Sequence, residues 1–209
     1  MIKAIIFDVD GVLLDSRKAN DEFFRRLLEK AGYNQPSEES MSKVFNLTML
    51  DTIKFLTKEK SEAKIKKVWQ LGCKTKYPAK LLIMPEHLNE TIKTLSRNYK
   101  LGIVTGRIRK GVYRFFRMSK LGRYFDVAVS YEDYSKPKPN PESLLIALHK
   151  LKVKPEEAIY IGDALTDYQA AKNAGTGFIG FISGSASKED FKPLNVKFIT
   201  SLKELLKVI

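Results

Sequence analysis

The sequence has only one cysteine, Cys73, among its 209 residues, so no disulfide can form within the chain. This cysteine usage is typical of proteins in a reducing compartment, and we expect a cytoplasmic protein. Every apolar run is shorter than the roughly 18 residues that a membrane-spanning helix needs, so we expect no membrane partner. The N-terminal residues lack the longer apolar stretch and small-residue cleavage site of a signal peptide.

Acidic residues are also few: 24 against 37 lysines and arginines, which gives a net charge of +13. This excess has two interpretations, a surface that binds a polyanion or a lysine-rich surface exposed to water. We favour the second, because the lysines are dispersed between apolar positions of expected helices, and we expect no nucleic-acid partner. A positive field would still favour small phosphorylated metabolites. The oligomeric state stays open.

Short apolar runs alternate with segments of helical period. The runs suit strands buried on both faces of a parallel sheet, and the segments between them place apolar residues at helical spacing. The pattern predicts an α/β fold, a Rossmann-like open parallel sheet flanked by helices. The expected strands are 2–7, 101–104, 127–129, 158–161 and 178–182, and the expected helices are 86–97, 110–121 and 141–151.

One region interrupts this alternation. Residues 16–85 contain helical patterns and no convincing strand, and they directly follow the first expected strand. An insertion at this point would lie over the carboxyl ends of the strands, where open α/β sheets bind ligands. We therefore predict a helical cap domain over 16–85, inserted into a core domain made of 1–15 and 86–209.

Two carboxylates, Asp8 and Asp10, follow the first expected strand. If the strand alternation continued, both side chains would point the same way and repel each other unless a cation lay between them. Magnesium suits this position because it prefers oxygen ligands and substrate phosphate. The alternative is an ordinary turn at a strand end, where aspartate and glycine are common.

Three further segments add polar groups at strand ends or in loops. Thr105 and Gly106 offer a hydroxyl and a backbone N–H that could bind one phosphate oxygen, although a helix cap would use the same geometry. Lys136 lies in a proline-rich loop that could also be a plain surface turn. Asp163 and Asp167 follow another expected strand, and the alternative is that Asp163 and Thr166 merely cap a helix. Together with Asp8 and Asp10, these residues form the inventory for transfer of a phosphoryl group.

The same segments resemble the four motifs of the haloacid dehalogenase superfamily of phosphohydrolases, and within it the phosphoglycolate phosphatase-like branch. The similarity covers the expected core domain; the expected cap has no motif of its own. A branch that displaces halide lacks the second aspartate, so the presence of Asp10 favours phosphoryl chemistry. The matching segments are 7–13, 103–107, 135–141 and 159–167.

The resemblance implies a role for each motif residue. Asp8 would attack phosphorus and form an aspartyl-phosphate, and Asp10 would act as acid and then as base. The fixed cation would be Lys136, which we favour over Lys138 for its spacing to the following helix; the resemblance assigns no role to Arg107. Thr105, Gly106 and Lys136 would bind the substrate phosphate, and Asp8, Asp10 (through its backbone carbonyl), Asp163 and Asp167 would hold Mg²⁺.

We accordingly expect a magnesium-dependent phosphatase, a phosphoric monoester hydrolase that acts on a small phosphate monoester. A sugar phosphomutase could use the same scaffold and return the phosphoryl group to the sugar. A non-catalytic protein that binds nucleic acid through its positive charge is the third interpretation. The presence of all the proposed catalytic residues argues against that third interpretation.

Overall fold

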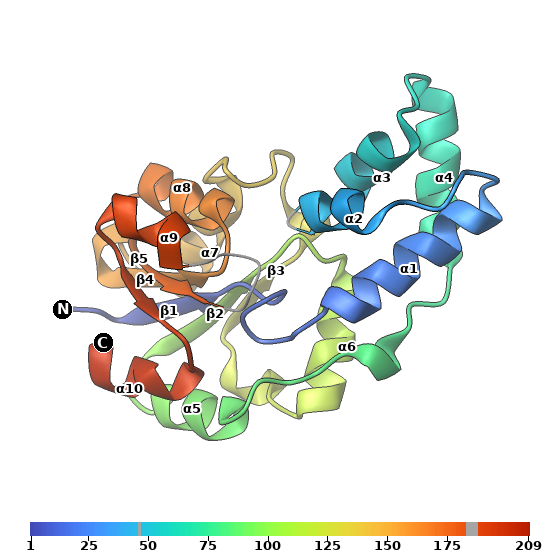
Figure 1. The fold of residues 1–209 in the computed structure, drawn as a ribbon. Helices are drawn as coiled ribbons and strands as arrows, with labels where there is room; N and C mark the ends of the chain where they lie inside the picture. The colour runs from blue at the N-terminus through green and yellow to red at the C-terminus, as the bar shows by residue number, and fades with distance from the viewer. Residues whose placement is uncertain (46, 183–187) are drawn as a thin grey trace. The chain divides into compact units, whose positions relative to one another are not determined.

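The computed structural model describes residues 1–45, 47–182 and 188–209. The chain divides into two compact units, one made of Met1–Asp15 and Met84–Ile209 and the other of Ser16–Ile83 (Figure 1). These boundaries fall beside those expected after residues 15 and 85. The division into a core domain and a cap domain with separate roles stays a prediction.

The first unit is built on a six-stranded sheet with strand order β3-β2-β1-β4-β5-β6, in which every neighbouring pair is parallel (Figure 1). This architecture confirms the expected α/β open parallel sheet. The sixth strand was not expected, because its sequence Lys-Phe-Ile has only two apolar residues and does not stand out as an apolar run. The strands are β1 (Ala4–Phe7), β2 (Lys100–Val104), β3 (Val127–Val129), β4 (Ala158–Gly162), β5 (Gly177–Phe181) and β6 (Lys197–Ile199).

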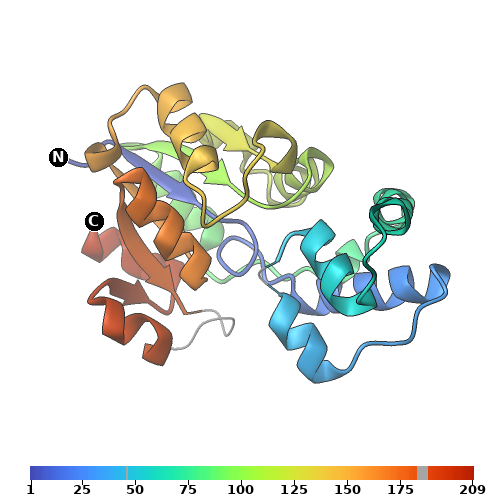
Figure 2. The same cartoon turned by 90° about the horizontal axis from the view of Figure 1, so that it is seen from above.

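Helices cover both faces of this sheet (Figures 1 and 2). On one face α7 packs against β2 and β3, and α8 packs against β4 and β5. On the other face lie α5 and α10, which contact each other. The helices of the first unit are α5 (Leu88–Leu95), α6 (Arg109–Ser119), α7 (Glu142–Leu151), α8 (Leu165–Ala174), α9 (Lys188–Phe191) and α10 (Leu205–Val208).

The central strand β1 is fully buried because helices lie on both of its faces. Ala4 and Ile6 join the apolar core under α7 and α8, and Phe7 packs edge-on against Phe125 with ring centroids 6.3 Å apart. Each of these side chains is 0% exposed in β1, which explains why this strand reads as a continuous apolar run rather than an alternating one.

The strand order reverses direction at β1, which lies between β2 and β4. Phe7 is in register with Ile103 on one side and with Ile161 on the other. The loops that follow these three strands therefore emerge next to one another. In open α/β sheets ligands bind at this switch point, beyond the carboxyl ends of the strands.

The second unit is helical over its described residues, as its sequence pattern predicts. Its core consists of apolar side chains from every one of its α-helices, including Phe23, Leu27, Met41, Ile53 and Ile65. No helix in the described parts of the chain is both long and apolar enough to cross a bilayer. The α-helices of this unit are α1 (Arg17–Lys30), α2 (Glu38–Val44), α3 (Met49–Thr57) and α4 (Glu62–Lys74).

Candidate active site

Asp8 is the first residue after β1, and its side chain is buried between the neighbouring strand ends. Its backbone N–H donates to the carbonyl of Ile161 at 2.9 Å, which continues the pairing of β1 with β4. The chain then turns through Gly11, whose φ of +76° is in the left-handed region that favours glycine. The tight turn brings the loop after β1 against the loop after β4.

Asp8, Asp163 and Asp167 form a buried acidic cluster in which one carboxylate oxygen of each lies within 4.8 Å of the others. Burial is the main cause that raises the pKa of the Asp8 carboxyl well above its usual value. The charges of Asp167 and Asp163 raise that pKa further, against the opposing effect of Lys138. Mg²⁺ prefers oxygen ligands and commonly binds one or two carboxylates together with substrate phosphate, so these residues fit the expected ion.

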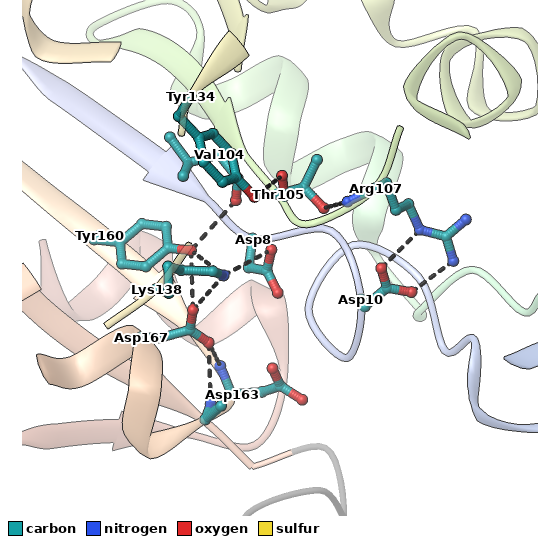
Figure 3. A network of polar contacts seen from close by, with 11 residues as sticks. Asp8, Asp10, Val104, Thr105, Arg107, Tyr134, Lys138, Tyr160, Asp163 and Asp167 are labelled. Atoms are coloured by element: carbon teal, nitrogen blue, oxygen red, sulfur yellow. Dashed lines mark hydrogen bonds and ion pairs between the residues drawn. The ribbon is translucent and has the colours of Figure 1, made fainter. Parts of the chain in front are cut away.

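Asp167 is held by contacts on both of its carboxylate oxygens (Figure 3). Oδ2 accepts hydrogen bonds from the backbone N–H groups of Asp163 and Ala164, each at 3.1 Å. Oδ1 accepts from the Lys138 ammonium at 2.5 Å and from the Tyr160 hydroxyl at 3.1 Å. Asp167 thus closes the first turn of α8, and it also orients the loop that carries Asp163.

The ammonium group beside the acidic cluster belongs to Lys138. Its Nζ lies 3.3 Å from Oδ1 of Asp8 and 2.5 Å from Oδ1 of Asp167. Burial alone would lower the pKa of this ammonium, but the charges of Asp167 and Asp8 outweigh it and hold the pKa well above its usual value. Lys138 is therefore a fixed cation, and it lies next to an oxygen of Asp8 that accepts no hydrogen bond from the described residues.

The structure differs here from the sequence-based preference for Lys136. The side chain of Lys136 is exposed, and its backbone N–H donates to the Glu142 carboxylate at 2.7 Å. That contact holds Lys136 on the outer side of the loop, two residues before the point where the loop turns inward at Lys138. Both lysines precede a proline, so the local sequence could not separate them, and spacing to the helix favoured the outer one.

Tyr160 is a member of this network that the sequence analysis did not single out. It is 0% exposed on β4, and its hydroxyl accepts from the Lys138 ammonium at 3.0 Å. The hydroxyl lies within donating distance of Oδ1 of Asp167 and of the Val104 carbonyl, at 3.1 and 3.3 Å. Burial raises the pKa of Tyr160 well above its usual value. A tyrosine in an otherwise aliphatic buried strand needs hydrogen-bond partners, and this need was the signal available in the sequence.

Thr105 follows β2, which lies on one side of β1, whereas Asp163 follows β4 on the other side. The backbone N–H of Thr105 donates to the carbonyl of Val129 at 3.0 Å, and its carbonyl accepts from the hydroxyl of Tyr134 at 3.3 Å. Its side-chain oxygen accepts from the backbone N–H of Arg107 at 3.2 Å, so the hydroxyl proton can be donated elsewhere. A Cβ at Gly106 would meet no described heavy atom within 4 Å, so the packing does not itself require glycine there.

Asp10 points to a different partner from Asp8 (Figure 3). Its two carboxylate oxygens accept from Nε and Nη2 of Arg107 at 2.7 and 2.5 Å. The expectation that Asp8 and Asp10 would point the same way depended on strand alternation, but β1 ends at Phe7 and the alternation ends with it. Arg107, to which the sequence assigned no role, therefore contacts the residue expected to be the acid and base.

Comparisons with known proteins find relatives of this chain. Residues 5–181 match the family model described as haloacid dehalogenase-like hydrolase. The chain is 31% identical over 212 residues to a protein named pyrophosphatase PpaX from Bacillus mycoides, covering 100% of this chain and 97% of that protein.

Solved structures with the same fold cover nearly the whole chain. A provisionally named haloacid dehalogenase-like hydrolase from Bacteroides fragilis is 27% identical with a TM-score of 0.88, over 98% of this chain and 100% of that one. A provisionally named phosphoglycolate phosphatase from Lactobacillus plantarum has the same TM-score of 0.88 at 24% identity, with 100% of both chains covered. A provisionally named β-phosphoglucomutase from Thermotoga maritima is 25% identical with a TM-score of 0.74, over 99% and 98%.

Proposed function

Because the chain belongs to the haloacid dehalogenase-like hydrolases, we propose that it is a magnesium-dependent phosphatase that works through an aspartyl-phosphate on Asp8. The family membership and the class of enzyme, a hydrolase of the phosphatase type, confirm the expectations from the sequence. The single observation that carries the mechanism is the buried Asp8 carboxylate with the Lys138 ammonium 3.3 Å from its Oδ1. A nucleophile and a fixed cation in this arrangement suit attack on a phosphoryl group.

The metal site would be formed by the carboxylates of Asp8 and Asp163 and the backbone carbonyl of Asp10. Asp167 already accepts four hydrogen bonds, so we assign it mainly to orienting Asp163 and Lys138. Bound Mg²⁺ would polarise the phosphoryl oxygens and balance the charge of the carboxylates. Burial raises the pKa of Asp8, and a cation bound beside it would favour the ionised form that the nucleophile needs.

The chain's own residues divide the reaction into two steps. In the first, an oxygen of Asp8 forms a bond to phosphorus, and the bond to the leaving group breaks with its electron pair on the leaving oxygen. Asp10 supplies a proton to that oxygen where one is needed. In the second, Asp10 takes a proton from water, whose oxygen attacks phosphorus and releases Asp8. Thr105, the Gly106 backbone and Lys138 would hold the phosphoryl oxygens throughout.

For the substrate, we propose a small phosphorylated compound, with a phosphoanhydride such as inorganic pyrophosphate as the first candidate. The similarity to proteins named pyrophosphatase over the full chain supports an anhydride. The phosphate monoester expected from the sequence is the next class to test. The helical second unit is inserted directly after β1, so we propose that it acts as a cap that selects the leaving group. A cytoplasmic location stays part of this proposal.

The experiment that tests the function is phosphate release from a panel of substrates in the presence of Mg²⁺. The panel holds pyrophosphate, several sugar phosphates, phosphoglycolate and an aryl phosphate, and the Asp8→Asn variant is measured beside the wild type. We expect turnover by the wild type and none by Asp8→Asn, because an amide cannot form the acyl phosphate. Turnover that survives in pure Asp8→Asn protein would overturn the mechanism.

A sugar phosphomutase is the second candidate, supported by the similarity to a provisionally named β-phosphoglucomutase. The same reactions, analysed for isomerised sugar phosphates, separate the two functions. Isomerisation faster than phosphate release would favour the mutase. A phosphatase releases phosphate from its substrate without accumulating an isomer.

A further inference from the structure

We propose that Arg107 determines specificity by allowing the site to accept a leaving group that is itself an anion. This inference deepens the proposed function and rests on it, because it assigns the leaving-group side of the site to Asp10 and its partner. The substrate class that follows is a phosphoanhydride or another compound with a second anionic group next to the scissile phosphate.

The first step is the position of Arg107. Its backbone N–H donates to the side-chain oxygen of Thr105 at 3.2 Å, so Arg107 belongs to the same turn as the residues proposed to bind phosphate. Its guanidinium reaches across to the loop after β1 and binds both carboxylate oxygens of Asp10. Arg107 therefore connects the phosphate-binding turn to the proposed acid (Figure 3).

The second step is the place of the leaving group. A general acid must lie within hydrogen-bond reach of the oxygen that it protonates. If Asp10 protonates the leaving oxygen, the Arg107 guanidinium that binds Asp10 lies on the leaving-group side of the site. Lys138 instead contacts Asp8 and Asp167. The two cations of the site would thus serve different parts of the substrate.

The third step is the charge that the leaving group meets. A neutral alcohol released from a monoester can lie beside a lone carboxylate at little electrostatic cost. When pyrophosphate is cleaved, the bridging P–O bond breaks with its electron pair on the departing phosphate, which carries about −1.5 to −2 charges near neutral pH. Such an anion would be repelled by an unpaired Asp10 carboxylate. With Arg107 bound through two N–H groups, the charge of the Asp10 carboxylate is balanced, and the guanidinium geometry is suited to phosphate oxygens.

Screening by water would weaken this effect if the pair were exposed. The side chain of Arg107 is only 9% exposed and that of Asp10 is 23% exposed, so screening is limited. Arg109, two residues later, provides a contrast. It is 54% exposed and pairs with Asp133, which lies outside the acidic cluster. Removing either arginine changes the total charge equally, but Arg107 contacts Asp10 whereas Arg109 contacts Asp133.

The experiment compares Arg107→Met with the matched control Arg109→Met, and adds Arg107→Lys. For each protein, kcat/KM is measured with Mg²⁺ on pyrophosphate and on a sugar phosphate, whose leaving group is a neutral alcohol. Because loss of one partner of a desolvated charge pair has large effects, we expect Arg107→Met to lower the ratio of the two values by roughly 100-fold. Arg109→Met should leave the ratio within about 2-fold, and Arg107→Lys should fall between.

Two results would contradict the role of Arg107 while leaving the phosphatase mechanism in place. An equal loss on both substrates in Arg107→Met would mean that Arg107 only positions Asp10. A wild type that hydrolyses monoesters and leaves pyrophosphate intact would also overturn it. If the proposed function itself is wrong, no substrate will give phosphate release that depends on Asp8. The thermal unfolding of each variant shows whether it is folded. If Arg107→Met does not fold, the ratio of the two kcat/KM values is compared between Arg107→Lys and the wild type instead.

Discussion

Gly11 and Asp163 approach so closely that a Cβ added to Gly11 would lie 1.8 Å from Oδ2 of Asp163. The side chain of Asp163 thus occupies the space that any other residue at position 11 would need. We predict that Gly11→Ala displaces Asp163 and lowers kcat/KM by about 100-fold, since small misplacements of reacting groups have effects of this size. Steady-state kinetics with Mg²⁺ would measure the loss.

A matched control separates this clash from backbone strain. Gly32 has nearly the same φ, +77°, but a Cβ there would meet nothing within 4 Å. Both alanine variants should lose about 1–2 kcal/mol of folding free energy from the left-handed backbone. Only Gly11→Ala should lose activity at a temperature where both proteins are folded. Comparable activity losses in the two variants would mean that strain, and not the displacement of Asp163, is responsible.

The two lysines of the proline-rich loop should differ sharply when each is replaced by methionine. Lys138→Met removes the ammonium 3.3 Å from Asp8, so we predict a loss in kcat of roughly 100- to 1,000-fold. Lys136→Met removes an exposed side chain and should change kcat by about 2-fold or less. A larger loss in Lys136→Met than in Lys138→Met would restore the sequence-based preference for Lys136 as the fixed cation.

Tyr160 should act by positioning Lys138 and Asp167. Tyr160→Phe keeps the buried ring but removes the hydroxyl that contacts both groups, so we predict a loss in kcat/KM of about 10-fold, as for a lost buried hydrogen-bond partner. A double-mutant cycle with Lys138→Met measures whether the two residues act together. We expect the combined variant to lose little beyond Lys138→Met alone. Fully additive losses would show that the hydroxyl does not act through Lys138.

Metal removal should affect stability as well as turnover. The carboxylates of Asp8 and Asp163 are buried together, so bound Mg²⁺ should stabilise the folded protein by mass action. We predict that a chelator abolishes activity, that added Mg²⁺ restores it, and that Mg²⁺ raises the melting temperature of the wild type. In Asp163→Asn this increase should be much smaller. Full activity after exhaustive chelation, or an equal increase in both proteins, would exclude a metal site at this cluster.

Much of the fold follows from local sequence patterns because burial in a parallel sheet leaves a strong local signal. The residues of β1 form an apolar run because helices cover both faces of the strand. In α7 the buried face is visible in the sequence as leucines at helical spacing, Leu144, Leu148 and Leu151. The strand β6 was not predicted because it begins with Lys197 and has only two apolar residues, so it does not form an apolar run. The positions of Asp8, Thr105 and Asp163 at strand ends were predictable for the same reason, since each follows an apolar run directly.

The sequence by itself determined the class of fold, the family and the residues from which a phosphoryl-transfer site can be built. Only the tertiary structure decided which side chains meet. The choice of Lys138, the hydroxyl of Tyr160 and the pairing of Arg107 with Asp10 each depend on segments that are far apart in the chain. Such contacts are determined by loop paths and side-chain directions, which begin where the regular strand ends. The two-residue alternation that predicts directions within a strand does not extend into those loops.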